Sequence, residues 1–370
     1  MCIDDLTCLR EVVKDEALTT TGSPGVYSFA SYWLLRCLKS HRECTEDYRI
    51  PKLPKRVIDV GSHDSNDPVR IHEAFPEQKG HCLALSYRWG KDPVKLLEKN
   101  LESYKTALPV QDLSQIFRDA IEATRKLGIK YLWVDALCIM QDSEAEWESE
   151  IHSMDQVFRQ ALLTIAAHVG PSAVQPGMFR SRETPNSSGN ASFRGAGILE
   201  TRGWTLQEQV LSRRMLVFTE DEVLWTCVGI DASISQPAGI KVHQDGPTRE
   251  SQVRLLQRYL NGFDRDQRFF LRNTYEIWLT LVTEYSRRDL TNGSDRLAAL
   301  AGIQAAIGTM LGDECVAGIW RSQLGAQMLW WIDDGSQGST WQLRQHGTRY
   351  PFYREKEPTF RRAVEFEAPS

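Results

Sequence analysis

Between residues 80 and 170, short continuous runs of hydrophobic residues alternate along the chain with segments in which hydrophobic residues recur at helical spacing. Three short apolar runs, 82–86, 131–134 and 162–166, are typical of strands that are buried on both faces. Between them, apolar residues recur three and four positions apart, which predicts two amphipathic helices. This alternation of strands and helices predicts βαβ units, so the expected fold class is α/β with a parallel sheet at its core.

The two predicted helices have recognisable ends and apolar faces. The first is expected to begin near Asp112, where an acceptor side chain followed by Gln115 is typical of a capping box, and to end at Gly128. The second carries an apolar stripe that consists of Trp147, Ile151, Met154, Phe158 and Ala161. Each helix is therefore expected to bury one face.

The remaining stretches suggest how the chain is organised. Residues 1–55 are mixed and polar and form an N-terminal segment, whereas 56–230 contain the α/β pattern and form the main domain. Within that domain, residues 171–200 are rich in Gly, Ser, Pro and Asn and are expected to form a long loop or insertion. Residues 231–370 mix short strands with helices and are expected to pack on the main domain as an α+β extension.

Composition narrows the classes of protein to consider. The 370 residues are 41% hydrophobic and 25% charged, which is typical of a globular protein. A net charge of −5 is not the basic footprint of a nucleic-acid-binding protein. Neither a membrane-spanning apolar run nor a signal peptide is evident, so we expect a soluble cytoplasmic protein without nucleic-acid or membrane partners.

The eight cysteines are too sparse for a disulfide framework, but three candidate metal ligands lie near one another at Cys37, His41 and Cys44. Two thiols and an imidazole at this spacing could supply three zinc ligands, with the fourth from the neighbouring pair His81 and Cys82. The default interpretation is reduced structural cysteines with a surface histidine, and we assign no metal and no cofactor. Whether the three residues bind a metal is left open.

Polar residues mark the ends of two predicted strands. Ser86 and Asp135 stand at the carboxyl ends, where ligands bind in open α/β sheets. Ser86 is followed by Tyr87, Arg88 and Trp89, which add a cation and two aromatic rings at the same rim. Two interpretations remain open: a ligand site, or scaffold residues that satisfy the backbone and cap a turn.

Glu150 is the carboxylate that we single out on the second helix. It lies three residues after Trp147 and therefore on or beside the apolar stripe. Partial burial would raise its pKa and suit it to acid–base or electrostatic chemistry. The alternative is a salt bridge with a neighbour such as Arg125 or Arg159.

Three further residues allow more than one interpretation. Arg202 and Glu208 either pair with the 86–90 rim or pair with each other. Cys138 lies near His152, but its flanking residues are apolar, which favours a buried structural cysteine over a nucleophile.

Several segments resemble, in order and spacing, the successive motifs of the fungal heterokaryon-incompatibility (HET) domain. The strongest are HCLALSYRWG (81–90), YLWVDALCIMQDSEAEWESEIHSMDQVFRQALLTIAAH (131–168) and TRGWTLQEQVLSRRMLVF (201–218). The upstream LPKRVIDVG (53–61) and the downstream EYSRRDLTNGSDRLAALAGI (284–303) also resemble the family. The resemblance spans roughly residues 30–320 and identifies 56–230 as the HET domain.

This resemblance implies a fold similar to that of the TIR domain, a flavodoxin-like α/β unit. It also implies a role in fungal self/non-self recognition that leads to incompatibility cell death. Some TIR domains cleave NAD with a glutamate four residues after a tryptophan, and Glu150 is the matching position here, although it follows Trp147 by three. In this interpretation Glu150, Asp135 and Ser86 are catalytic.

The same interpretation assigns substrate contacts around the rim. Arg88 would hold the diphosphate and Trp89 would stack on a ring, with Arg202 and Glu208 completing the binding site. No GxGxxG or GxxxxGK[ST] motif occurs, so neither a Rossmann fingerprint nor an NTPase loop is indicated. Expected partners are NAD or another metabolite, further incompatibility proteins, or a second copy of the chain. Two alternatives stay open: a tailoring enzyme or accessory factor of fungal secondary metabolism, and a non-catalytic interaction module.

Overall fold

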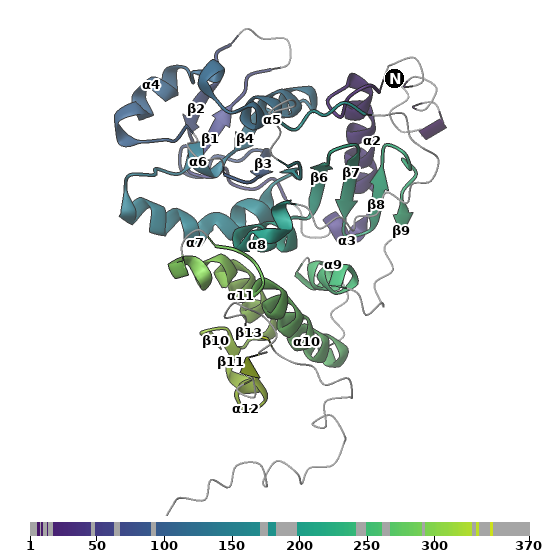
Figure 1. The fold of residues 1–370 in the computed structure, drawn as a ribbon, viewed down its shortest axis with the longest axis vertical. Coiled ribbons are helices and arrows are strands. Elements are labelled where there is room, and N and C mark those ends of the chain that lie inside the picture. Colours follow the sequence, from purple (N-terminus) through teal and green to yellow (C-terminus); the bar gives the residue numbers. More distant parts are fainter. Residues whose placement is uncertain are drawn as a thin grey trace, which may run out of the picture.

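A nine-stranded mixed sheet forms the centre of the molecule (Figure 1). The computed structural model describes residues 18–45, 49–62, 67–89, 94–170, 177–182, 198–241, 249–260, 267–290, 293–327, 331–332 and 341–342, with four positions before residue 18. The strands of the sheet are β1 (Arg56–Asp59), β2 (Arg70–Glu73), β3 (Cys82–Ser86), β4 (Tyr131–Trp133), β5 (Leu163–Ala167), β6 (Arg214–Phe218), β7 (Val223–Cys227), β8 (Ile230–Ser233) and β9 (Ile240–Lys241). Two small hairpins pair β10 (Cys315–Val316) with β11 (Ile319–Trp320) and β12 (Trp331–Ile332) with β13 (Trp341–Gln342).

The strand order across the sheet is β2-β1-β4-β3-β5-β6-β7-β8-β9. The four central strands, β4, β3, β5 and β6, pair in parallel. Antiparallel strands flank this core, with β1 and β2 on one side and a meander of β7, β8 and β9 on the other. The sheet is therefore mixed, with parallel pairing confined to its centre.

The predicted α/β core with parallel strands is confirmed. The first strand has the predicted bounds 82–86, and the others lie within one residue of prediction, at Tyr131–Trp133 and Leu163–Ala167. Every side chain of β3 and β5 is buried, which explains why these strands appear in the sequence as continuous apolar runs. The meander begins before residue 230, so the proposed domain boundary at this point falls inside the sheet.

Helices cover both faces of the sheet (Figure 1). They are α2 (Pro24–Ser40), α3 (Arg42–Thr45), α4 (Leu101–Thr106), α5 (Gln115–Lys126), α6 (Asp135–Cys138), α7 (Glu144–Gln160), α8 (Gly203–Leu211), α9 (Arg249–Leu260), α10 (Gln267–Tyr285), α11 (Ala298–Leu311) and α12 (Leu324–Gln327). α5 lies on one face, whereas α7 and α8 lie on the other, between the sheet and α9–α11. None of the helices in the described ranges is both long and apolar enough to cross a bilayer.

The ends of α5 show where local sequence determines the structure. Its N-cap is Ser114, whose hydroxyl accepts the hydrogen bond of the Phe117 amide at 3.3 Å. The expected cap at Asp112 is therefore wrong by two positions, because Asp112 belongs to a preceding 3₁₀ turn. Gly128 follows the helix with φ of 71°, so the predicted glycine stop is confirmed.

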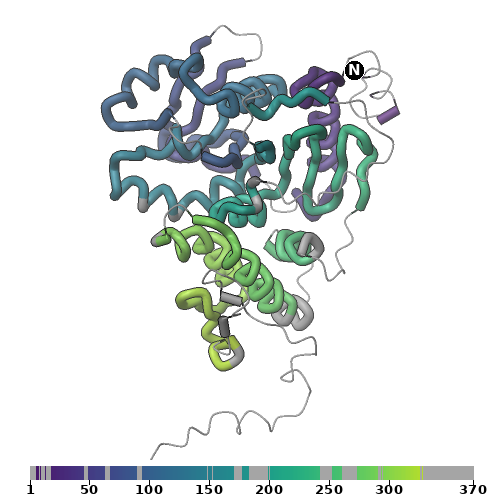
Figure 2. The backbone as a smooth tube through the Cα atoms, in the orientation of Figure 1, coloured from purple at the N-terminus to yellow at the C-terminus, as the bar shows by residue number. Residues whose placement is uncertain are grey.

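The N-terminal helix lies beside the meander, although almost 200 residues separate them in the sequence (Figure 2). The Trp33 indole of α2 donates to the Pro237 carbonyl at 2.8 Å and packs its ring against Trp225 of β7. Both tryptophans are fully buried. Residues 24–45 are thus part of the same core as the sheet.

The segment after α10 is hydrogen-bonded to the residues at the start of α8. The amide of Gly203 donates to the Asp289 carbonyl at 2.9 Å, and the Asp289 amide donates to Thr201 at 2.6 Å. A Cβ on Gly203 would lie 2.5 Å from Leu290 Cδ2, so glycine permits this close approach. The C-terminal helices therefore support the element that carries Glu208.

Candidate functional site

The parallel register brings two strand ends together at one edge of the sheet. Ala84 of β3 lies opposite Trp133 of β4, so Ser86 and Asp135 come level just beyond the last paired residues. α8, which lies in the connection between the parallel strands β5 and β6, adds Glu208. Three segments that are distant in sequence thus meet at the carboxyl edge, where ligands bind in open α/β folds.

Ser86 and Glu208 form the buried centre of this edge. The Ser86 hydroxyl donates a short hydrogen bond to Glu208 Oε2, and both residues are buried. Of the two interpretations of Glu208, pairing with the 86–90 rim is confirmed.

Asp135 holds the residues after β3 in place. Its Oδ1 accepts from the Tyr87 hydroxyl at 2.8 Å and from the Ala136 amide at 2.7 Å, and its Oδ2 accepts from Trp89 Nε1 at 2.6 Å. Both carboxylate oxygens are therefore occupied by donors. The position of the Trp89 ring depends directly on this carboxylate.

Arg202 connects the rim to the segment after α10. Its guanidinium donates to the Tyr87 carbonyl at 2.8 Å, and its own carbonyl accepts from Arg288 at 3.2 Å. Arg288 also contacts Thr205 at 3.2 Å and Glu284 at 2.8 Å. The positive charges of Arg202 and Arg288 thus lie on the side of the cluster where α8 begins.

Burial dominates the electrostatics of the cluster. It raises the pKa of Glu208 to about 7, with a further contribution from the charge of Asp135, against the opposing effect of the Ser86 hydrogen bond and Arg202. Burial also raises the pKa of Asp135, although hydrogen bonds from Trp89 and Tyr87 oppose the increase. Glu208 therefore changes protonation near neutral pH, which is the property expected of a general acid or base.

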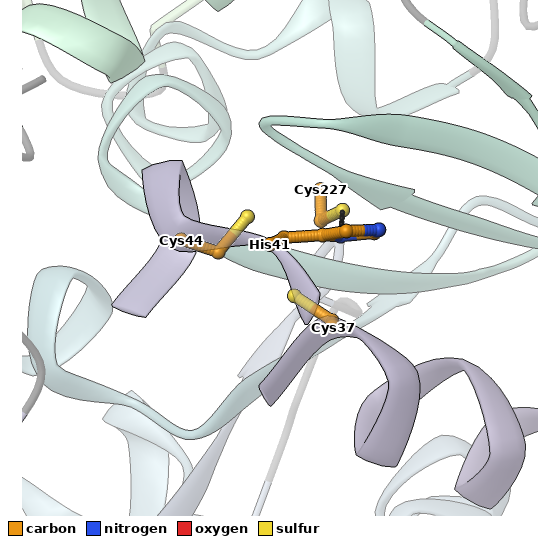
Figure 3. Close-up of side chains that lie close together, drawn as sticks. All are labelled: Cys37, His41, Cys44 and Cys227. Atoms are coloured by element: carbon orange, nitrogen blue, oxygen red, sulfur yellow. Dashed lines mark hydrogen bonds between the residues drawn. The ribbon is translucent and has the colours of Figure 1, made fainter. Parts of the chain in front are cut away.

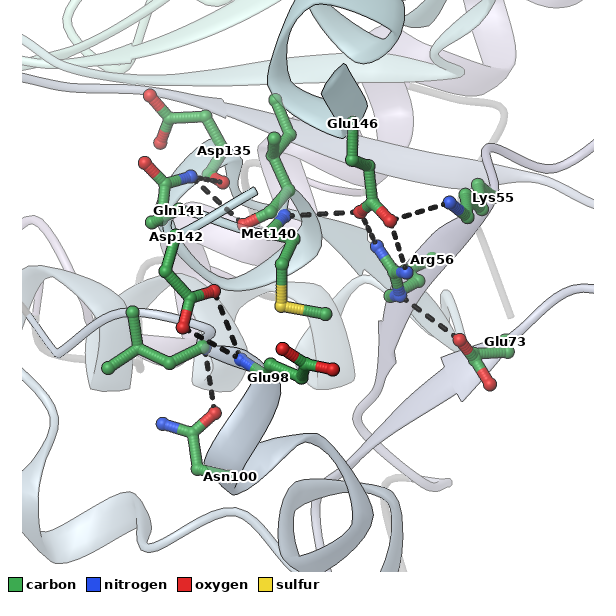
Figure 4. A network of polar contacts seen from close by, with 12 residues as sticks. Lys55, Arg56, Glu73, Glu98, Asn100, Asp135, Met140, Gln141, Asp142 and Glu146 are labelled. Carbon is green, nitrogen blue, oxygen red and sulfur yellow. Dashed lines mark hydrogen bonds and ion pairs between the residues drawn. The ribbon is translucent and has the colours of Figure 1, made fainter. Parts of the chain in front are cut away.

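Glu150 lies in a different electrostatic environment. Burial raises its pKa, as expected, but the charges that act on it are those of Lys55, Arg56 and Glu146. Figure 4 shows these three neighbours. Glu146 accepts a hydrogen bond from Lys55 at 2.8 Å and forms a short ion pair with Arg56. The charges that shift the pKa of Glu150 do not include those of Arg125 and Arg159, the partners expected in the alternative interpretation.

Three other residues singled out in the sequence lie in clearly defined surroundings. The Arg88 side chain is exposed at the rim, whereas Trp89 is half-buried with Lys95 Nζ 5.4 Å from its ring centroid. Cys138 is buried, and burial raises the pKa of its thiol, so the structural interpretation of this cysteine is confirmed.

Residues 83–208 match the family model described as heterokaryon incompatibility protein (HET). The chain contains a HET domain. Its match begins in β3 and ends at Glu208, and it includes all seven candidate residues: Ser86, Arg88, Trp89, Asp135, Glu150, Arg202 and Glu208. No curated protein and no solved structure matches the chain.

Two residues of the polar cluster around Ser86 and Glu208 are not among the candidates predicted from the sequence. The sequence predicts Tyr87 only as an aromatic residue of the rim, and its adjacency to Ser86 is the signal that could have indicated its role. Arg288 lies outside the family match, in the segment that resembles the region following HET domains. Only the three-dimensional contact with Thr205 shows that it reaches α8.

The residues that could hold a metal ion form a separate group. Cys37, His41, Cys44 and Cys227 are all buried, and their ligand atoms lie within 4.8 Å of one another. The expectation of a surface histidine is therefore wrong. His41, in the turn after α2, is buried and contacts Cys227 at the end of β7. Cys227 joins the other three ligands, in the place suggested for His81 or Cys82.

Proposed function

We propose that this chain is a fungal incompatibility effector that acts in the cytoplasm, and that its HET domain has a TIR-like, flavodoxin-like core. The match over residues 83–208 supports the role in incompatibility. The order of the parallel strands supports the fold assignment. Across the sheet these strands lie in the order β4-β3-β5-β6. If β3, β4, β5 and β6 are numbered 1 to 4 along the chain, this order is 2-1-3-4, which is the beginning of the flavodoxin order 2-1-3-4-5.

The proposed reaction is cleavage of the ribose–nicotinamide bond of NAD at the carboxyl edge of the sheet. Breaking this bond develops positive oxocarbenium character on the ribose, which a nearby carboxylate stabilises. One observation carries the assignment: Glu208, with a pKa of about 7, lies in hydrogen-bond contact with Ser86 at the strand switch point. A second carboxylate, that of Asp135, belongs to the same cluster.

Each residue then has a distinct role. Glu208 accepts a proton from the attacking water, Asp135 provides negative charge, and Trp89 offers an aromatic face for stacking. The exposed Arg88 and the half-buried Arg202 supply positive charge for a diphosphate. This assignment favours Glu208 over Glu150 as the principal carboxylate, because the interactions of Glu150 are with Lys55, Arg56 and Glu146.

The test is expression of the full chain in a fungal host, with growth and cellular NAD measured over time. Glu208→Gln keeps an acceptor for Ser86 but loses the ionisable group, so NAD consumption should fall by about 10²–10³-fold. Glu150→Gln is the parallel variant that tests the residue matched to TIR domains. Glu122→Gln on the exposed side of α5 is the matched control and should behave like the parent chain.

The outcomes separate the candidate functions. Loss of growth arrest and of NAD consumption in Glu208→Gln supports the proposal, whereas loss only in Glu150→Gln transfers the role to that residue. Growth arrest with an unchanged NAD level in the parent chain would contradict NAD cleavage and favour a non-catalytic interaction module. Neither effect in the parent would favour the metabolite-tailoring alternative, to be tested with acyl and peptide-like substrates.

A further inference from the structure

Four buried ligand side chains converge where the end of α2 meets the end of β7 (Figure 3). We propose that Cys37, His41, Cys44 and Cys227 bind a structural Zn²⁺ ion that fastens the N-terminal helices to the meander. The site is separate from the polar cluster of the HET domain. All four residues lie outside the family match at 83–208.

The spacing of the ligand atoms suits a single tetrahedral ion. All of them lie within 4.8 Å of one another, and His41 Nδ1 is 3.4 Å from Cys227 Sγ. In a tetrahedral zinc site, with Zn–S near 2.3 Å and Zn–N near 2.1 Å, a sulfur and a nitrogen lie about 3.6 Å apart. The observed separation therefore requires little movement to admit the ion.

Local backbone structure presents three of the ligands together. Cys37 is in the last turn of α2, and the His41 amide donates to its carbonyl at 3.1 Å. The Cys44 amide in turn donates to the His41 carbonyl at 3.0 Å. Two successive turns therefore present Cys37, His41 and Cys44 to the same point.

The fourth ligand comes from the opposite part of the sequence. Cys227 ends β7 and lies 186 positions from His41. Gly229 follows in the turn to β8, where a Cβ would lie 3.3 Å from His41 Nδ1 and 2.6 Å from Glu43 Oε1. The absence of a side chain at Gly229 lets the hairpin approach the histidine closely.

A buried arginine provides the charge that such a site needs. Arg214 lies directly opposite Cys227 in the β6–β7 pair and is 1% exposed. Its Nε donates to Cys37 Sγ at 3.2 Å, and another guanidinium nitrogen donates to the Cys44 carbonyl at 2.9 Å. Three thiolates and Zn²⁺ carry a net charge of about −1, which the guanidinium balances in the interior.

The donor set selects the metal by its chemistry. Three sulfurs and one imidazole form the Cys₃His set of structural zinc sites, whereas Mg²⁺ and Ca²⁺ prefer oxygen ligands. With four protein ligands, the ion would have no open position for a substrate. Its expected contribution is to folding, because the four ligands meet only in the folded chain.

The first experiment measures the metal content of the full chain purified from zinc-supplemented cells. Elemental analysis should give about one zinc per chain. Replacement of zinc by Co²⁺ should give the visible absorption of a tetrahedral cobalt–thiolate site, which reports sulfur ligation independently of stability. A strong chelator should release the zinc and lower the unfolding temperature.

Variants then assign the ligands. Cys227→Ser and Cys44→Ser should reduce the zinc content from about one per chain to near none. Cys315→Ser is the matched control, because Cys315 is half-buried in β10 and is not in the group. His41→Cys should retain zinc, since Cys₄ sites are also common, whereas His41→Ala should lose it.

Three results would overturn the proposal. The first is a folded parent chain that contains no zinc after purification from supplemented cells. The second is a cobalt-loaded parent without thiolate absorption, and the third is a disulfide among Cys37, Cys44 and Cys227 in the purified chain. The cobalt spectrum and the thiol count use the parent chain, so the proposal stays testable even where a ligand variant fails to fold.

Discussion

The Ser86 hydroxyl at the end of β3 donates a hydrogen bond to the Glu208 carboxylate in α8, across a separation of 122 residues. This contact joins the two ends of the HET match, which begins at Leu83 and ends at Glu208. α8 reaches β3 because β5 and β6 are added on the side of β3 opposite β4. The strand order therefore creates the cluster, and the identities of the buried side chains determine its protonation.

Stability should depend on pH through Glu208. Burial raises its pKa from 4.5 to about 7 in the folded chain. The folded state therefore holds this proton to a higher pH than the unfolded state. The stabilising contribution of the protonated carboxyl group is complete below about pH 4.5 and is lost as the pH rises to about 7. The unfolding free energy should fall by about 3 kcal/mol over this range.

Chemical denaturation of the parent chain and of Glu208→Gln between pH 4 and 8 measures this contribution. Glutamine does not titrate, so the difference in unfolding free energy between the two chains should change in favour of the variant as the pH rises. Titrating groups distant from Glu208 cancel in this comparison, whereas Asp135 interacts with Glu208 and contributes to the measured difference. A difference that stays constant over the range would mean that Glu208 keeps an ordinary pKa.

Tyr87 and Trp89 should be energetically coupled through Asp135. Each donates to a different oxygen of that carboxylate, at 2.8 and 2.6 Å. Tyr87→Phe and Trp89→Phe should each cost about 1–2 kcal/mol of unfolding free energy, because a hydrogen bond to a buried carboxylate is lost. The double variant should cost more than the sum, by about 0.5–1 kcal/mol, because the carboxylate then keeps few donors.

A double-mutant cycle by urea denaturation measures the coupling. Tyr87→Phe preserves the edge contact between ring 87 and Phe117, whose centroids are 5.0 Å apart, so packing changes little. Strict additivity would show that Asp135 does not link the two side chains.

The strands of the core could be predicted from the sequence because burial on both faces leaves a plain signal. The runs at 82–86 and 131–134 contain almost only apolar residues, and their parallel pairing follows from the helix between them. The edge strands left no such signal. β2 has one buried residue among its four positions, and β9 has two exposed residues, so neither can be recognised from periodicity.

Glu146 should be needed for stability at neutral pH. The hydrogen bond from buried Arg56 lowers the pKa of Glu146 to about 2. Its contribution is therefore present above about pH 4.5 and is lost as the pH falls to about 2. Glu146→Gln should cost about 1–2 kcal/mol at pH 7, since Arg56 keeps Glu73 as a partner at 3.1 Å.

Glu122→Gln provides the comparison for Glu146→Gln. Glu122 pairs with Lys126 one turn away on the exposed surface of α5, so its loss should cost less than about 0.5 kcal/mol. Denaturation at pH 7 and at pH 3 measures both variants. Equal losses at pH 7, or a Glu146→Gln deficit that does not shrink at pH 3, would contradict the predicted role.

The candidate sites show what sequence reasoning can and cannot reach. Ser86 and Asp135 could be predicted because strand ends of a parallel sheet converge by geometry. The surroundings of Glu150 could not be predicted. Helical spacing shows on which face of α7 the residue lies, but it does not show that the charges of Lys55 and Arg56 act on it. Cys227 could not be predicted as a ligand either, because only the packing of α2 on β7 brings it to His41.

The packing of α11 on the sheet-covering helices gives the last prediction. Gly302 of α11 donates its amide to Gln207 Oε1 of α8 at 3.0 Å. A Cβ at this position would lie 2.3 Å from Asp155 Cβ of α7 and 2.8 Å from Gln207 Oε1. Gly302→Ala must therefore move α11 away from both helices, which should cost about 2–3 kcal/mol. Helix propensity alone would favour alanine by about 1 kcal/mol, so destabilisation identifies the steric contact as the cause.

Gly293→Ala is the matched control, because a Cβ there has no neighbour within 4 Å and Gly293 is not among the glycines with positive φ. Its unfolding free energy should stay within about 0.5 kcal/mol of that of the parent. Urea denaturation followed by two probes, tryptophan fluorescence and far-ultraviolet circular dichroism, measures both variants. Coincident transitions in the parent, and a lower midpoint for Gly302→Ala in both probes, would show that α11 unfolds together with the HET domain. If Gly302→Ala instead left the main transition unchanged, α11 would be a separate unit, and the support that residues 284–289 give to α8 would not depend on it.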